Sequence, residues 1–318
     1  MNFVHTSVLL EECLHFLMPE SPEPLFIDGT MGEGGHTHAF LTRFPQLKAI
    51  GIDADPTIQA KAKQRLAPFA GRVTFFLGWS DDFFSQYPQD VPAPSLILFD
   101  LGISLFHYIE SGRGFSFRAE EPLDMRINPQ EKRTAADIVN SYPEKALADL
   151  LYLFAGERFS RPIARAIVEE RQKAPFTDAR RLGETVFKAV PARFRHGQIH
   201  PATKTFQALR IAVNNELDRL PRLLESAFSR LSEQGKLGVI SFHSLEDRIV
   251  KRFFKDLAKK CICPPEMPIC KCGGQPRAEL LTKKPVEPSA EEISRNAPSR
   301  SARLRVIRKL SLRRSSPV

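Results

Sequence analysis

Short apolar runs recur through the first hundred residues of the chain, and each ends at a polar or glycine-rich turn. The runs end at Asp28, Asp53, Phe76 and Asp100. Runs of four to six residues separated by helical lengths of chain are typical of buried parallel strands. The pattern predicts an α/β fold with a parallel sheet, whose ligand site lies at the carboxyl ends of the strands.

The next buried run, 236–242, begins more than a hundred residues after Asp100. A parallel crossover needs only a few tens of residues, so something is inserted. Apolar positions three or four apart predict helices in this interval, separated by prolines, at 135–139, 144–153, 163–170 and 182–190. We therefore predict a sheet domain in two parts, 1–107 and 204–318, with an inserted all-helical domain, 108–203, that covers the site.

The segments after the insert have their own patterns. Residues 200–217 predict a helix with one buried face, and the tail 295–309 alternates basic and apolar residues, as a last strand of the sheet would. Between them, 275–290 is polar and contains prolines, which predicts a loop. Ser244 and Asp247 resemble a capping box at the start of another helix.

A glycine-rich loop follows the first strand, with Gly29, Gly32, Gly34 and Gly35 inside seven residues. Such a loop lets backbone amides approach a small ligand, although a purely structural turn is the alternative. The dinucleotide fingerprint lacks its third glycine, and no Gly-Lys-Ser/Thr follows. Asp53, at the end of the second strand, stands where doubly wound folds hold ribose hydroxyls. S-adenosylmethionine, which has a ribose but no pyrophosphate, fits this pattern better than a dinucleotide.

Composition adds a second expectation. In 318 residues, no apolar run approaches the length of about 18 needed to span a bilayer. The amino terminus lacks the features of a signal peptide, so we expect a cytoplasmic protein without a membrane partner. The net charge of +9 favours a polyanionic partner, with a solvated basic surface as the alternative. Arginines concentrate in the insert, at 113, 118, 158, 161, 165, 180, 181, 193 and 195.

One of the five cysteines stands alone, and the other four lie close together in the sequence. Cys13 lies on an amphipathic helical pattern and is predicted to be a core residue. Cys261, Cys263, Cys270 and Cys272 form either a zinc knuckle or a metal-free, proline-rich loop. Their Cys-x-Cys spacing differs from the usual Cys-x2-Cys, so no metal ligand is assigned.

Long motifs in this chain resemble one family, the bacterial 16S rRNA (cytosine-N4) methyltransferase H family. The resemblance spans nearly the whole chain and rests on 5–10, 28–36, 100–104, 113–117, 122–126, 163–167, 200–217 and 239–250. It implies a Rossmann-like class I methyltransferase sheet that uses S-adenosylmethionine. The implied substrate is a cytidine in the decoding region, at the P site, of 16S rRNA within the small ribosomal subunit. Self-association is compatible with the sequence.

The resemblance also implies a set of cofactor residues. They are Gly34, Gly35 and His36 in the loop, Asp53 at the ribose, Trp79 after the third strand, Asp100 after the fourth, and His107. His107 stands where the family usually has glutamine. Phe83 is an alternative to Trp79, and Pro162 replaces a usual basic residue.

The reaction can be narrowed from the residues themselves. Methylation at carbon five of cytosine needs a cysteine nucleophile, and no cysteine lies between Cys13 and Cys261. Asp100 is followed by Leu-Gly-Ile, not by the Pro-Pro-Tyr/Phe of DNA amino methyltransferases. Direct transfer to an exocyclic amine remains, with Asp100 or His243 accepting an N–H hydrogen bond and aligning the nitrogen.

Two questions stay open at this stage. Asp124 either meets the target base or pairs with Arg126. The alternative function is an RNA-binding ribosome assembly factor with a methyltransferase fold, and a small-molecule methyltransferase is a further rival. The basic insert favours RNA over a small molecule.

Overall fold

The computed structural model describes residues 7–197, 199–260, 263, 267 and 274–311. The chain divides into two compact units, Met1–Ile103 with Asp218–Val318, and Ser104–Leu217. The insert therefore begins four residues earlier and ends fourteen residues later than the predicted range 108–203. The later end has a physical reason, because the helix that contains residue 203 packs against the other helices of the insert.

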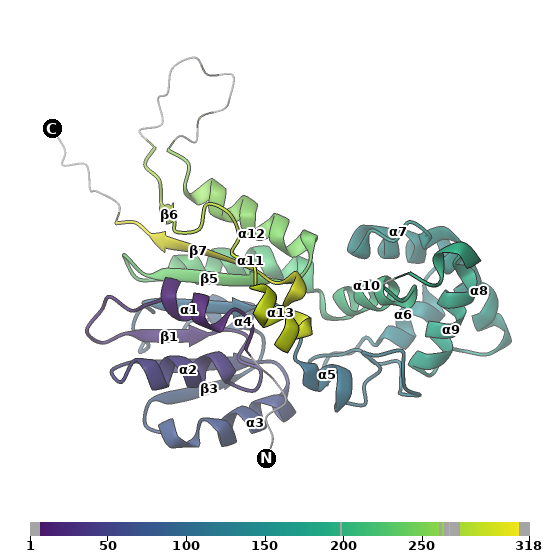
Figure 1. The fold of residues 1–318 in the computed structure, drawn as a ribbon, viewed down its shortest axis with the longest axis horizontal. Coiled ribbons are helices and arrows are strands. Elements are labelled where there is room, and N and C mark those ends of the chain that lie inside the picture. The colour runs from purple at the N-terminus through teal and green to yellow at the C-terminus, as the bar shows by residue number, and fades with distance from the viewer. Residues whose placement is uncertain (1–6, 198, 261–262, 264–266, 268–273, 312–318) are drawn as a thin grey trace. The chain divides into compact units, whose positions relative to one another are not determined.

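The first unit is built on a seven-stranded sheet in the order β3-β2-β1-β4-β5-β7-β6 (Figure 1). The five strands β1 to β5 pair in parallel, and β7 runs antiparallel between β5 and β6. The strands are β1 (Leu25–Asp28), β2 (Lys48–Asp53), β3 (Val73–Leu77), β4 (Leu96–Asp100), β5 (Lys236–Ser241), β6 (Ala278–Leu280) and β7 (Arg303–Lys309). The predicted Rossmann-like sheet is confirmed, and so is the tail strand.

Helices cover both faces of this sheet. One apolar cluster joins the sheet to α1 (Leu10–Phe16), α2 (Gly35–Arg43) and α3 (Pro56–Arg65). The other joins it to α4 (Ser80–Ser85), α11 (Glu216–Arg230) and α12 (Ser244–Leu257). Strand β4 shows why its sequence is continuously apolar: Leu96 and Leu98 enter the first cluster, while Ile97 and Phe99 enter the second. Cys13 is fully buried in the first cluster, as predicted.

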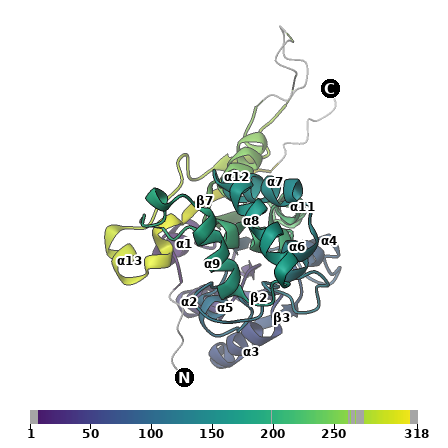
Figure 2. The same cartoon turned by 90° about the vertical axis from the view of Figure 1, so that its right-hand side faces the viewer.

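The second unit is helical, as predicted. Its helices are α5 (Leu105–Ile109), α6 (Ala135–Ser141), α7 (Glu144–Ala155), α8 (Ser160–Lys173), α9 (Ala179–Ala189) and α10 (Ala202–Asn214). Helix α10 contacts α6, α7 and α9, and its buried residues occur on most of its circumference. Figure 2 shows α6, α8 and α9 of this unit. Short elements complete the chain: η1 (Ala67–Phe69), η2 (Ala192–Phe194), α13 (Ala290–Arg295) and η3 (Ala297–Ser301).

Three sequence predictions need correction. The helix predicted over 200–217 ends at Asn214, because Asn215 adopts a left-handed φ of 52°, and the chain resumes at once as α11. The loop predicted over 275–290 contains the edge strand β6, which pairs with β7. The capping box of α12 consists of His243 and Glu246, not of Ser244 and Asp247.

Among the described residues, no helix has both the length and the apolar composition needed to cross a membrane.

Candidate functional site

The carboxyl ends of the parallel strands gather polar side chains at one edge of the sheet. Asp28, Asp53 and Asp100 end β1, β2 and β4, and His243 follows β5. Strands β1 and β4 are neighbours, and the strand order reverses between them. In open α/β sheets a ligand binds at such a reversal, outside the carboxyl ends of the strands. The fold therefore places the predicted residues Asp53, Asp100 and His243 at one candidate site, together with Asp28.

The glycine-rich loop between β1 and α2 owes its shape to two left-handed residues, Gly32 with φ 54° and Gly34 with φ 76°. A Cβ atom on Gly32 would meet no atom within 4 Å, so space is open beside the loop there. At Gly35 a Cβ atom would lie 2.1 Å from the Ser7 hydroxyl oxygen, so a larger residue would force that hydroxyl to move. The backbone of the loop therefore lies against Ser7 at Gly35 and borders open space at Gly32.

Asp53 holds this loop in place. Its Oδ2 accepts a hydrogen bond from the Gly32 N–H at 2.8 Å, and its Oδ1 accepts one from the Asp55 N–H at 2.8 Å. These two bonds fix the carboxylate of Asp53 at the edge of the loop, where β2 ends. The Asp53 carbonyl also accepts from the Gly78 N–H at 2.8 Å, which fixes the residue before Trp79.

Trp79 and its alternative, Phe83, differ in burial. Phe83 is 5% exposed and belongs to the core, whereas Trp79 is only partly buried. The Arg219 guanidinium lies 4.6 Å from the centre of the Trp79 ring, and its Nη1 donates to both oxygens of Asp81, at 2.8 and 3.0 Å. Trp79 is therefore the better candidate for stacking on a ligand ring. Sequence reasoning missed Arg219 because it did not predict α11.

His36 connects the amino-terminal segment to β4. Its Nε2 lies 3.0 Å from the Val8 carbonyl oxygen, and its Nδ1 lies 4.0 Å from Oδ2 of Asp100. The side chain is only 6% exposed. Its closest described partners are thus protein groups, and these contacts orient the histidine next to the Asp100 carboxyl group.

Burial raises the pKa of Asp100 from 3.8 to about 7. The nearby negative charges of Asp28 and Glu246 raise this pKa further, while the Gly102 N–H, 3.2 Å from Oδ1, opposes the shift. The Asp100 N–H donates to Oγ1 of Thr30 at 2.6 Å, which ties the end of β4 to the glycine-rich loop. This carboxyl group therefore changes its charge near neutral pH.

A second buried acid lies at the end of β1. Burial raises the pKa of Asp28 from 3.8 to about 6, although the Thr37 hydroxyl donates to its Oδ2 at 2.7 Å. Asp28, Asp100 and Glu246 are close enough that the charges of the other two disfavour ionisation of Asp100. Repulsion among buried carboxylates is relieved by a cation, so this end of the sheet suits a positively charged ligand.

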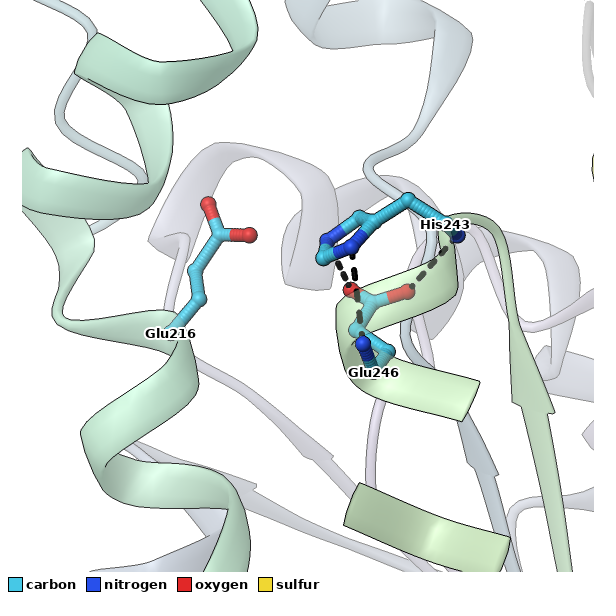
Figure 3. Close-up of side chains that lie close together, drawn as sticks. All are labelled: Glu216, His243 and Glu246. Carbon is cyan, nitrogen blue, oxygen red and sulfur yellow. Dashed lines mark hydrogen bonds and ion pairs between the residues drawn. The ribbon is translucent and has the colours of Figure 1, made fainter. Parts of the chain in front are cut away.

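His243 is the N-cap residue of α12, and its side chain lies next to Glu246 (Figure 3). Its Nε2 lies 3.1 Å from Oε1 of Glu246, and its Nδ1 lies 3.5 Å from the Glu246 backbone nitrogen. Oε2 of Glu246 accepts from the Phe242 N–H at 2.8 Å. Nδ1 of His243 therefore caps α12, while its buried Nε2 lies near Oε1 of Glu246 without a hydrogen bond.

Two predicted residues lie in the helical unit. His107 is 4% exposed on α5, and its ring packs edge-on against Phe106 and Phe115. Asp124 accepts two hydrogen bonds of 2.7 Å from the Arg126 guanidinium and one of 3.0 Å from the Arg126 backbone N–H. Of the two roles considered for Asp124, the pairing with Arg126 is the one that the structure contains.

Comparison with known proteins gives the family. The model of the MraW methylase family matches residues 2–310. The chain belongs to this family. A Treponema denticola protein named ribosomal RNA small subunit methyltransferase H is 66% identical, covering 99% of this chain and 100% of its own length. A Treponema pallidum protein of the same name is 48% identical, covering 96% of this chain and 92% of its own length.

Membership of the MraW methylase family confirms the resemblance found in the motifs. A Thermotoga maritima O-methyltransferase of known structure, described as S-adenosylmethionine-dependent, is 8% identical with a TM-score of 0.42, and covers 99% of this chain and 71% of its own. A TM-score this low says nothing about activity. The cysteine prediction lies mostly outside the described residues, because Cys261, Cys270 and Cys272 are not among them.

Proposed function

We propose that this methylase transfers a methyl group from S-adenosylmethionine to the N4 amine of a cytidine in the decoding region of 16S rRNA. One observation carries the proposal. A largely buried carboxyl group with a pKa of about 7, Asp100, ends β4 beside the glycine-rich loop. The names of the full-length relatives support ribosomal RNA of the small subunit as the substrate. We expect the protein to act in the cytoplasm.

The residues of the site fit the cofactor. S-adenosylmethionine, when bound, supplies a methyl group on a positively charged sulfonium. We propose that the backbone of Gly34 and Gly35 borders it, that Asp53 accepts from the ribose hydroxyls, and that the Trp79 ring stacks on the adenine. The buried acids Asp28 and Asp100 favour its positive charge. His36 contributes by orienting Asp100, and a contact between His107 and the cofactor remains a prediction.

Asp100 is the acceptor that the amine needs. The lone pair of the cytosine N4 amine is delocalised into the ring, so the amine is a poor nucleophile. An ionised Asp100 that accepts one N–H hydrogen bond localises this lone pair and orients the nitrogen. The acceptor works only when ionised, and its pKa of about 7 leaves a large fraction ionised at neutral pH.

His243, the other candidate acceptor, is expected to act through the helix cap. With Nδ1 facing the Glu246 N–H, a neutral ring carries its proton on Nε2, which faces Oε1 of Glu246. No ring lone pair then remains for the amine. His243→Asn retains a good N-cap side chain. We expect the turnover number of His243→Asn to stay within about threefold of the wild type. We expect His243→Ala to lower the free energy of unfolding by roughly 1 kcal/mol.

Steady-state methylation and thermal unfolding of these two variants check this prediction. A loss of turnover above about a hundredfold in His243→Asn, with normal cofactor binding, would assign general-base work to the histidine.

The proposed reaction is tested with purified protein, labelled S-adenosylmethionine and small ribosomal subunits that lack the modification. After digestion of the RNA, label is expected in N4-methylcytidine. Asp53→Ala serves as the control, because it should raise the KM for the cofactor. Label in another nucleoside would correct the target atom. No label with competent subunits, despite cofactor binding by the wild type, would favour the assembly-factor function.

The pH dependence of cofactor binding follows from the two buried acids. As pH rises from 5.5 to 7.5 through the pKa values of Asp28, about 6, and Asp100, about 7, both groups become negative. Negative charge attracts the sulfonium of S-adenosylmethionine, which S-adenosylhomocysteine lacks. We expect the ratio of the two dissociation constants to shift toward S-adenosylmethionine by about three- to tenfold over this range.

Isothermal titration calorimetry at several pH values measures both constants. The shift should be smaller in Asp100→Asn. A ratio that does not change with pH in the wild type would mean that the sulfonium does not sense these acids.

A further inference from the structure

Two groups of arginines in the helical unit differ in what they contact. The first group is occupied inside the unit. Arg113 donates to the Arg126 and Ile127 carbonyls, Arg181 to carbonyls at the end of α8, and Arg195 to those of Val190 and Lys188. These guanidinium groups satisfy carbonyls that would otherwise have no donor. They stabilise the unit and are poorly available to a partner.

Arg158 and Arg193 form the second group. Both are exposed, and both lie on the Phe194 ring, with Cζ at 4.2 Å and 4.8 Å from its centre. Arg158 also lies 4.7 Å from the centre of the Phe159 ring. Within the described part of the chain, neither guanidinium forms an ion pair with a carboxylate. Their charges are therefore not neutralised by the protein.

Two distant segments meet here, because the rings of Phe159 and Phe194 lie 5.2 Å apart. The segment 158–165 carries three arginines and no acidic residue, and the segment 190–204 carries two arginines, one lysine and no acidic residue. Lys204 joins the cluster near its edge, since its Nζ donates to the Gly156 carbonyl at 3.2 Å. We call Arg158, Phe159, Arg193, Phe194 and Lys204 the Arg158–Phe194 surface.

We propose that the Arg158–Phe194 surface binds single-stranded ribosomal RNA outside the target nucleotide. Unstacked RNA bases stack on aromatic rings and on guanidinium planes, and this surface offers both, next to positive charges for phosphates. An acidic protein surface would use the charges but not the stacked rings. The proposal rests on the proposed function for its substrate, and it assigns to this surface affinity for RNA, not a part in the chemistry.

The double variant Arg158→Ala/Arg193→Ala tests the proposal. We expect the KM for undermodified small subunits to rise about tenfold or more, with an unchanged turnover number at saturation. Binding of a short fluorescein-labelled single-stranded RNA should weaken similarly, and the slope of log K against log salt should fall by about 1.4. The matched control is Lys132→Ala/Lys145→Ala, which removes two exposed charges from the same unit. The control should stay close to the wild type.

A conservative variant separates stacking from charge. Phe194→Leu keeps an apolar side chain in the cluster, so it should fold, yet it should weaken RNA binding about threefold or more without changing the salt slope. Circular dichroism and binding of S-adenosylmethionine verify that each variant is folded.

Several results would overturn the proposal. Equal losses of RNA affinity in the test and control double variants would mean that only the net charge of the unit matters, not this surface. A loss with intact subunits but not with the free RNA would point to a ribosomal protein as the partner. A different result would contradict the proposed reaction and support the RNA-binding surface: the wild type binds RNA through this surface but leaves subunits unmethylated.

Discussion

Asp100→Asn is expected to lower the turnover number for cytidine methylation by about 10²- to 10³-fold, the range typical of a lost acid–base or positioning group. The substitution keeps the size of the side chain and removes the charge that accepts the N–H hydrogen bond. Cofactor binding should weaken by less than about tenfold, because the other proposed contacts remain. Single-turnover methylation and calorimetry with S-adenosylmethionine separate the two effects.

Asp53→Asn is the matched control for this experiment, because it changes a strand-end acid that is proposed to contact the cofactor and not the cytidine. It should affect the KM for S-adenosylmethionine more than the turnover number. If Asp100→Asn instead abolished cofactor binding and left the turnover of bound cofactor intact, Asp100 would be a cofactor ligand and not the acceptor.

The pH dependence of catalytic efficiency tests the role of Asp100 independently of the substitution. Its folded-state pKa of about 7 means that the carboxyl group loses its charge as pH falls below 7. The catalytic efficiency of the wild type should therefore fall about tenfold for each pH unit well below 7 and level off above it. Asp100→Asn should lack this limb. Efficiency that is independent of pH between 5.5 and 8 in the wild type would argue against an ionised Asp100 as the acceptor.

The strands were predictable because burial on both faces of the sheet requires an uninterrupted apolar run in the sequence. All of Leu96 to Phe99 is buried, so the run is apolar without interruption. Acids at the ends of such runs, Asp53 and Asp100, were therefore found as site candidates before the fold was known. By contrast, the three residues of β6 are too few for a pattern, and their pairing with β7 is set by tertiary structure.

Contacts between distant segments explain most of what the sequence did not reveal. The hydrogen bond from the Asp100 N–H to Thr30 and the contact of Arg219 with Trp79 join segments that no periodicity connects. The cap of α12 is similar. The sequence predicts a box of Ser244 and Asp247. In the structure His243 and Glu246 form the box, and Asp247 pairs with Arg305, 58 residues further along the chain.

Asp247→Ala is expected to cost about 3–5 kcal/mol of folding stability, the range for breaking a buried ion pair from one side. Oδ1 of Asp247 accepts from Nε of Arg305 at 2.7 Å, and Oδ2 accepts from Nη2 at 3.2 Å. The two residues are 8% and 7% exposed. Removing the carboxylate leaves the Arg305 guanidinium buried without its counter-charge. Urea unfolding followed by circular dichroism measures the change.

A double-mutant cycle shows whether the pair itself is responsible. Arg305→Met should be less harmful than Asp247→Ala, because Arg303 lies 3.5 Å from Oδ2 of Asp247 and remains as a partner. Asp247→Leu/Arg305→Met replaces both charges by apolar groups, so it should be destabilised by less than the sum of Asp247→Leu and Arg305→Met. The pair connects the first turn of α12 to β7, and that turn carries His243 and Glu246 beside the candidate site. The opposite result would be single substitutions that each cost less than about 1 kcal/mol of unfolding free energy and whose costs add in the double variant. The pair would then be solvated, and packing alone would hold α12 against β7.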